Sequence, residues 1–150
     1  MPVEVRGALK PSPTAEDYLE RIYALIREKG YARVSDIAAA LDVHPSTVTR
    51  MVQKLDEQRL LAYERYRGLV LTSEGERVGR AMHERHATIE QLLRLLGVED
   101  EQVVQRDTEG IEHHVSGDTL VILSHLLEFL RAHPEVLHRF HRFRRGSTGD

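Results

Sequence analysis

Residues 35–71 constrain the fold of this 150-residue chain more than any other segment. The hydrophobic spacing predicts two short helices, one over about 35–41 and one that opens at Pro45, with a tight break between them. Two short strands joined by a turn are predicted over 60–71. Two helices, a tight turn and a hairpin in this order are typical of a winged helix-turn-helix.

Apolar residues at the spacing that packs two helices at a steep angle support this prediction. They are Ile37, Ala38, Leu41, Val43, Val48, Val52 and Leu55. Ala38 is small at the point where the two helices would cross. Ser35 is a good N-cap for the first helix. Pro45 suits the first position of the second helix, because the backbone N–H that proline lacks would have no partner within the helix there.

The outward face of the helix that opens at Pro45 carries short polar and basic side chains, which suit base edges and phosphates in a major groove. The residues expected to contact DNA, two of them near the hairpin tip, are Ser35, Pro45, Ser46, Thr47, Thr49, Arg50, Gln53, Lys54, Arg65 and Arg67. The alternative is a solvated face of an ordinary helical domain, and winged helices also serve as protein-interaction modules. A hairpin at the length that a wing requires favours DNA binding.

Helices are also predicted on both sides of this segment. The first is expected to begin at Ser12, with Pro13 at its first helical position and Gly30 at its end. A long helix is expected from Ser73, which has capping-box spacing, to Gly97.

The second half of the chain is predicted to be helical throughout. One helix is expected over about 101–115, a break at Gly117 and Asp118, and a last helix that ends near Pro134. The fold class expected is therefore mainly α, with a winged helix-turn-helix DNA-binding domain over 1–72 and an all-helical metal-binding and dimerisation domain over 73–150.

Composition excludes several classes of protein. No apolar run approaches the ~20 residues that span a bilayer, and the N-terminus is too short and polar for a signal peptide. A cytoplasmic location without a membrane partner is therefore expected. The absence of cysteine excludes disulfides, thiolate zinc sites and iron–sulfur clusters.

Charge and histidine are distributed unevenly, which suggests two separate tasks. The net charge of −3 argues against nucleic-acid binding, but residues 1–80 hold thirteen basic and twelve acidic side chains. Residues 81–150 hold eight basic and twelve acidic side chains, and eight of the nine histidines.

Two groups of carboxylate and histidine residues have the spacing of one helix face. Glu109, Glu112 and His113 lie at i, i+3 and i+4, and Asp17 and Glu20 lie at i and i+3. The long helix adds a further candidate ligand, His86. Oxygen and nitrogen donors without sulfur suit a hard or borderline divalent cation with more than four ligands.

Other interpretations of these groups remain open at this point. Each group is also consistent with a solvated charged face. A two-metal hydrolase would use similar residues, but no nucleophile motif or phosphate-binding glycine-rich loop accompanies them, so no enzyme is expected. A metal-independent winged-helix regulator that binds an organic ligand is a further alternative.

Six segments resemble one known family over about residues 12–130. They are 16–23, 29–38, 43–49, 51–55, 66–72 and 109–114. The sequence resembles the diphtheria toxin repressor family of metal-dependent regulators, most closely its manganese transport regulator branch. The resemblance implies a homodimer with paired winged domains and a metal site between the two domains, holding two Mn²⁺ ions per subunit.

The resemblance also implies a set of metal ligands. They are Asp17, Glu20, His86, Glu109, Glu112 and His113. Iron-responsive members of the family carry Met at the position of Asp17 and Cys at the position of Glu109. Both positions hold oxygen donors in this chain, which favours manganese.

The function that the resemblance implies is an Mn²⁺-activated repressor of manganese-uptake genes, which binds a double-stranded DNA operator with an inverted repeat. The alternative within the same family is an iron-responsive repressor.

Overall fold

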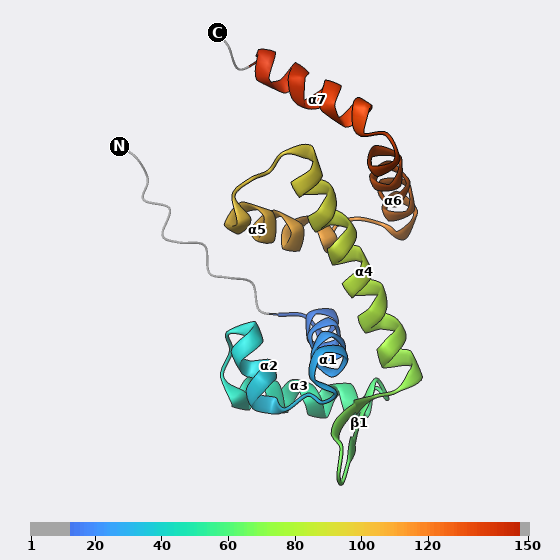
Figure 1. Cartoon of the computed structure of the whole chain (residues 1–150). Coiled ribbons are helices and arrows are strands. Elements are labelled where there is room, and N and C mark those ends of the chain that lie inside the picture. The colour runs from blue at the N-terminus through green and yellow to red at the C-terminus, as the bar shows by residue number, and fades with distance from the viewer. Residues whose placement is uncertain (1–12, 148–150) are drawn as a thin grey trace, which may run out of the picture. The chain divides into compact units, whose positions relative to one another are not determined.

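The computed structural model describes residues 13–147 and divides between Arg80 and Ala81 into two compact units. The elements, in chain order, are α1 (Ala15–Lys29), α2 (Val34–Leu41), α3 (Pro45–Glu57), β1 (Leu61–Glu64), β2 (Gly68–Leu71), α4 (Ser73–Leu96), α5 (Glu101–Glu112), α6 (Gly117–Ala132) and α7 (Pro134–Ser147) (Figure 1). The predicted fold class, mainly α with a winged helix-turn-helix, is confirmed. Within the described residues, no helix has the length and apolar character to cross a membrane.

The first unit is built around one hydrophobic core. Ile22 of α1, Ile37 of α2 and Val48 of α3 are fully buried and pack together. Of the seven predicted inner-face residues, Ile37, Ala38, Val48 and Leu55 are buried, and the other three pack against this core. The hydrophobic spacing therefore identified the correct faces of α2 and α3.

The start of α1 differs from the prediction. Ser12 lies outside the described residues, and Pro13 precedes the helix, which begins at Ala15. Thr14 is the N-cap: its Oγ1 accepts from the backbone N–H of Asp17 at 3.3 Å, and the Asp17 carboxylate accepts from the backbone N–H of Thr14 at 2.7 Å. Gly30, with φ of +82°, ends the helix as predicted.

The turn between α2 and α3 is tight. Asp42 adopts a left-handed conformation with φ of +54°, and Pro45 is the first residue of α3, as predicted. The N-cap of α3 is His44, whose Nδ1 accepts from the backbone N–H of Ser46 at 3.1 Å. Ser35 does not cap α2, because that helix already begins at Val34.

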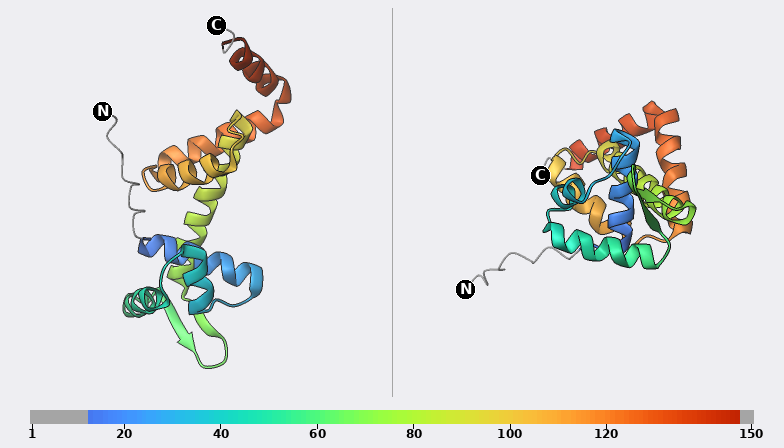
Figure 2. Two further views of the ribbon diagram at one scale, coloured as in Figure 1. Left: turned by 90° about the vertical axis from the view of Figure 1, so that its left-hand side faces the viewer. Right: turned by 90° about the horizontal axis from the view of Figure 1, so that it is seen from below.

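The predicted hairpin is confirmed as β1 and β2, which pair antiparallel with Leu61 opposite Leu71 and Glu64 opposite Gly68. Figures 1 and 2 show this hairpin extending beyond α1, α2 and α3. Its loop holds residues 65–67, and Gly68, with φ of +75°, allows the chain to enter β2.

The first turns of α4 belong to the same unit and lie very close to its backbone. A Cβ atom at Gly75 would stand 1.7 Å from the carbonyl oxygen of Leu60. The cap of α4 is Thr72, whose Oγ1 accepts from the backbone N–H of Gly75 at 3.2 Å, and not Ser73 as predicted.

The second unit contains the rest of α4 with α5, α6 and α7. Leu92, Leu127 and Leu130 form its buried cluster, against which Val136 of α7 packs. The helix α5 ends at Glu112, three residues earlier than predicted.

The C-terminal helices depart from the prediction in two ways. Gly117 and Asp118 were expected to break the chain, but they are the first residues of α6, because Ser116 caps that helix by accepting from the backbone N–H of Thr119 at 3.2 Å. The helix α7, which begins at Pro134, was not predicted.

Candidate DNA-binding surface and metal centre

The helix α3 presents a continuous polar face. Val48 and Leu55 point into the core and Met51 and Val52 pack against it, so the other side of α3 faces solvent. Exposed as predicted are Ser46, Thr47, Thr49, Arg50, Gln53 and Lys54, together with Ser35 and Pro45. The side chains of Arg50, Gln53 and Lys54 form no hydrogen bond or ion pair with residues 13–147, so they are available to a ligand.

The wing carries basic and aromatic side chains at its tip. Arg65 lies over the ring of Tyr66, 5.6 Å from its centroid, and Arg67 contacts Glu64 at 3.4 Å. Tyr66 is 91% exposed and Tyr63 is 75% exposed. These tyrosines were not among the residues predicted to contact DNA, although they lie beside the wing arginines in the sequence.

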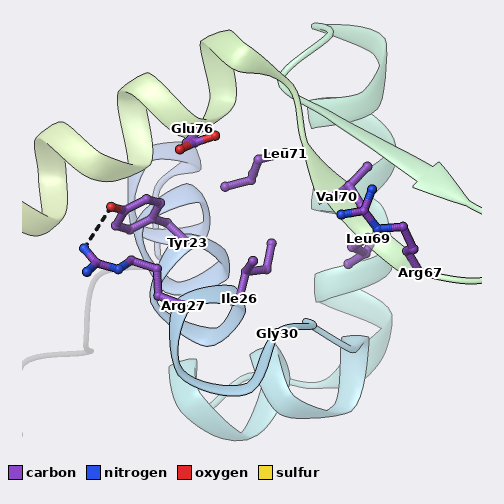
Figure 3. Close-up of a pocket in the computed structure, with 9 residues that line it drawn as sticks. All are labelled: Tyr23, Ile26, Arg27, Gly30, Arg67, Leu69, Val70, Leu71 and Glu76. Atoms are coloured by element: carbon purple, nitrogen blue, oxygen red, sulfur yellow. Dashed lines mark hydrogen bonds between the residues drawn. The ribbon is translucent and has the colours of Figure 1, made fainter.

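A groove of about 220 Å³ lies between α1, β2 and the start of α4 (Figure 3). Leu69, Val70 and Leu71 line one side, and on α1 the hydroxyl of Tyr23 accepts a hydrogen bond from Arg27 Nη1 at 3.1 Å. Specific small-molecule sites usually combine an apolar lining with several convergent polar groups. Arg67 and Glu76 also line the groove, so the groove does not distinguish a regulator that binds an organic ligand from a metal-dependent one.

The second unit brings three of the predicted metal ligands together. Nδ1 of His86 on α4 lies 2.8 Å from Oε2 of Glu112 on α5. Nε2 of His113, the residue that caps α5, lies 3.7 Å from the other oxygen of the same carboxylate. Glu112 is only 2% exposed, and a buried carboxylate requires a compensating cation or hydrogen bonds. This donor set fits a divalent cation.

Arg85 fixes the end of α5 beside this cluster. Its Nη1 donates to the backbone oxygens of Glu112 at 3.0 Å and Val115 at 2.9 Å. The last carbonyls of a helix have no partner within the helix, so Arg85 satisfies that of Glu112 and holds this residue in place.

A second carboxylate reaches the other side of the His86 ring. Oε2 of Glu90 lies 2.9 Å from Nε2 of His86, and Glu90 is paired in turn with Arg94. Arg94 also forms two hydrogen bonds to Glu101, at 2.9 and 2.7 Å, and these lower the pKa of the Glu101 carboxyl. Sequence reasoning missed Glu90, although its i+4 spacing from His86 was a usable signal.

The other predicted ligands are described separately. Glu109 is exposed on α5 and forms no hydrogen bond or ion pair with the residues that the structure describes. Asp17 and Glu20 lie one turn apart on α1 in the first unit, where both are half-buried. The six-residue ligand set as a whole stays a prediction.

Comparison with known families decides what the two units are. Residues 10–69 match the model of the iron dependent repressor N-terminal DNA binding domain, and residues 72–140 match that of the iron dependent repressor metal binding and dimerisation domain. The chain belongs to the iron-dependent repressor family. The resemblance seen in the sequence is thereby confirmed.

Individual members of the iron-dependent repressor family are also similar. The HTH-type transcriptional regulator MntR of Shouchella clausii (strain KSM-K16) is 54% identical over 121 residues, which are 81% of this chain and 84% of that protein. The structure of the manganese regulator SloR matches with a TM-score of 0.69 at 27% identity, over 78% of this chain and 54% of that one. A manganese-dependent transcriptional repressor in complex with manganese matches with a TM-score of 0.65 at 27% identity, over 77% of this chain and 53% of that one.

The chain therefore spans most of MntR but only about half the length of these two solved structures. Its family consists of metal-dependent transcriptional regulators, so the prediction that the chain is not an enzyme is confirmed.

Proposed function

We propose that this chain is an Mn²⁺-activated transcriptional repressor that binds a double-stranded operator as a homodimer and controls manganese-uptake genes. The observation that carries the proposal is the buried Glu112 carboxylate between His86 and His113, in a chain whose α3 exposes a polar face. The names of its relatives support manganese, since the similar proteins include MntR and the manganese regulator SloR.

The proposed ligands of two Mn²⁺ ions per subunit are Asp17, Glu20, His86, Glu109, Glu112 and His113. Oxygen-rich sites suit Mn²⁺, which binds weakly in the divalent series and must be selected by ligand type and geometry. The oxygen donors Asp17 and Glu109 favour Mn²⁺ over Fe²⁺, because a soft sulfur ligand at either position would suit Fe²⁺ better.

The proposed mechanism is a coupling between the metal site and the DNA-binding surface. Asp17 and Glu20 belong to α1, which packs through Leu19 and Ile22 into the core that also holds α3. His86 and Glu112 belong to the other unit. Metal ligation by residues of both units would restrict the position of α3, and hence the spacing of the two recognition helices in a dimer.

An exposed apolar stripe on α6 supports the dimer. Ile122 is 66% exposed, Leu126 39% and Phe129 47%, and these residues lie at i, i+4 and i+7 on one face of the helix. Apolar side chains gathered on one exposed face of a soluble protein mark an interaction surface. We propose that this stripe forms the contact between two subunits, which makes a two-fold dimer and an inverted-repeat operator the expected pair.

Selection from a random pool of duplex DNA tests this function. The full chain should enrich an inverted repeat with Mn²⁺ present, with half-sites about one helical turn or a multiple apart, and should enrich nothing with a chelator. Arg50→Ala should weaken binding to the selected site by ~1–3 kcal/mol if Arg50 reads a base. Glu57→Ala, at the end of the same helix, should leave this binding unchanged. Enrichment that does not depend on metal would contradict the proposal.

A further inference from the structure

The helix α7 has a charge opposite to that of the rest of its unit. It carries four arginines, Arg139, Arg142, Arg144 and Arg145, and one acidic residue, Glu135. The preceding residues of the unit, 81–133, hold four basic and ten acidic side chains. The basic charge of this unit is therefore concentrated in its last helix.

The arginines that precede α7 in this unit are all engaged within it. Arg85 donates to backbone carbonyls, Arg94 pairs with two glutamates, Arg106 contacts Asp107 and Arg131 donates to Gln91. In contrast, Arg139 and Arg142 are exposed, and their side chains form no hydrogen bond or ion pair with any residue from 13 to 147. Their charge has no visible role in holding the fold together.

Contacts at both ends of α7 fix it to the unit. Val136 packs on the Leu127 and Leu130 cluster, and Nη1 of Arg144 donates to the backbone oxygen of Leu96 at 3.2 Å. Gly97, with φ of +112°, leaves room for this contact, since a Cβ there would lie 2.2 Å from Arg144 Nη1. The helix is thus held in place, and Arg139 and Arg142, at i and i+3, share its outer face.

We propose that this outer face of α7 is a second DNA-contact surface, which binds the phosphate backbone of duplex DNA without reading its sequence. Duplex DNA carries one negative charge per ~1.7 Å of its axis, and unpaired guanidinium groups are well suited to phosphate oxygens. A membrane surface would also attract this charge, and Phe140 and Phe143 of α7 are 37% and 72% exposed. DNA is the partner proposed, because residues 10–69 of the same chain match a DNA-binding domain, and vesicle binding is an outcome of the test.

The test is the salt dependence of binding to duplex DNA. In Arg139→Gln/Arg142→Gln, the slope of log K against log salt should become shallower by about 0.9 for each phosphate that is no longer neutralised, or about 1.8 for each subunit. This change should be equal on random-sequence duplex and on a selected operator. Glutamine keeps the helix propensity close to that of arginine, so circular dichroism should be unchanged.

A matched control removes the same charge elsewhere in the unit. Arg106→Gln/Arg131→Gln should leave the slope near that of the unchanged protein. Equal slopes for the two double variants, or an unchanged slope for the α7 variant, would overturn the proposal. So would binding to anionic phosphatidylserine vesicles that is lost in the α7 variant while DNA binding is kept.

The inference rests on DNA binding by this chain but fails separately from the proposed function. The Arg50→Ala variant should lose its preference for the operator over random duplex and keep most of the salt dependence of DNA binding. The α7 variant should keep its preference for the operator and its dependence on metal, and should lose part of the salt dependence of DNA binding.

Discussion

Removal of the Glu90 carboxylate should weaken metal binding although Glu90 is not a proposed ligand. The His86 ring lies between two carboxylates, with Nδ1 at 2.8 Å from Glu112 and Nε2 at 2.9 Å from Glu90. Glu112 belongs to the proposed ligand set, so Glu90 is the outer partner that orients the ring. Loss of such a partner typically lowers metal affinity 10–100-fold, or about 1.4–2.8 kcal/mol.

Two substitutions separate charge from hydrogen bonding at this position. Glu90→Gln keeps an acceptor oxygen and should lower the Mn²⁺ affinity about 10-fold. Glu90→Ala leaves Nε2 of His86 to solvent, so its Mn²⁺ affinity should fall by close to 100-fold. Arg94 keeps its bonds to Glu101 in either variant, so the link between α4 and α5 remains. Calorimetric titration with Mn²⁺ measures the affinity, and Glu84→Gln, exposed on the same helix, is the control. Equal affinities for Glu90→Ala and the control would refute the orienting role.

Three further predictions concern stability, assembly and selectivity. Gly75→Ala should lower the free energy of unfolding measured in denaturant, because overpacking against the Leu60 carbonyl costs ~1–3 kcal/mol and outweighs the ~1 kcal/mol gain in helix propensity. Gly110→Ala should raise the free energy of unfolding, because no heavy atom lies within 4 Å of the added Cβ. Ile122→Asp should convert the dimer to monomers in light scattering, and a dimer that persists would exclude the α6 stripe as the interface. Asp17→Met should let Fe²⁺ drive anaerobic operator binding nearly as well as Mn²⁺ does, and an unchanged Mn²⁺ preference would show that selectivity arises elsewhere. The same variant should lose about 1 kcal/mol of stability, because the Asp17 carboxylate no longer caps α1.

The elements with one strongly apolar face could be predicted from the sequence. Ile37 and Leu41 on α2, and Val48 and Leu55 on α3, recur at helical spacing along one face of each helix. This spacing predicts both the helical state and the face that is buried. Exact helix ends could not be predicted, because Ser12 and Thr14 are both able to cap α1. The choice depends on the reciprocal bonds between Thr14 and Asp17, which spacing alone does not show.

The helix α7 was missed because its apolar signal is weak. It has no buried residue, and its attachment depends on Val136 and on the Arg144 bond to a carbonyl far away in sequence. The break expected at Gly117 was wrong for a related reason, since the cap at Ser116 outweighs the low helix propensity of one glycine in the first turn.

Spacing within one helix predicted part of the metal centre but not its cross-helix contacts. Glu112 and His113 were identified together because they are neighbours near the end of one helix. The pairing of Glu112 with His86, 26 residues earlier, depends on how α4 and α5 pack, as does the support that Arg85 gives to the end of α5. His86 was a candidate by its place on the long helix, and the family resemblance then implied it as a ligand.

The central claim is that metal and DNA sites are coupled, and coupling must be reciprocal. The most direct measurement is the Mn²⁺ affinity of the full chain with and without its selected operator, beside the operator affinity with and without Mn²⁺. The account predicts that each ligand strengthens the other by the same factor, on the order of 5–150-fold. Mn²⁺ affinity that is unchanged by operator, together with operator affinity that is unchanged by chelation, would contradict it.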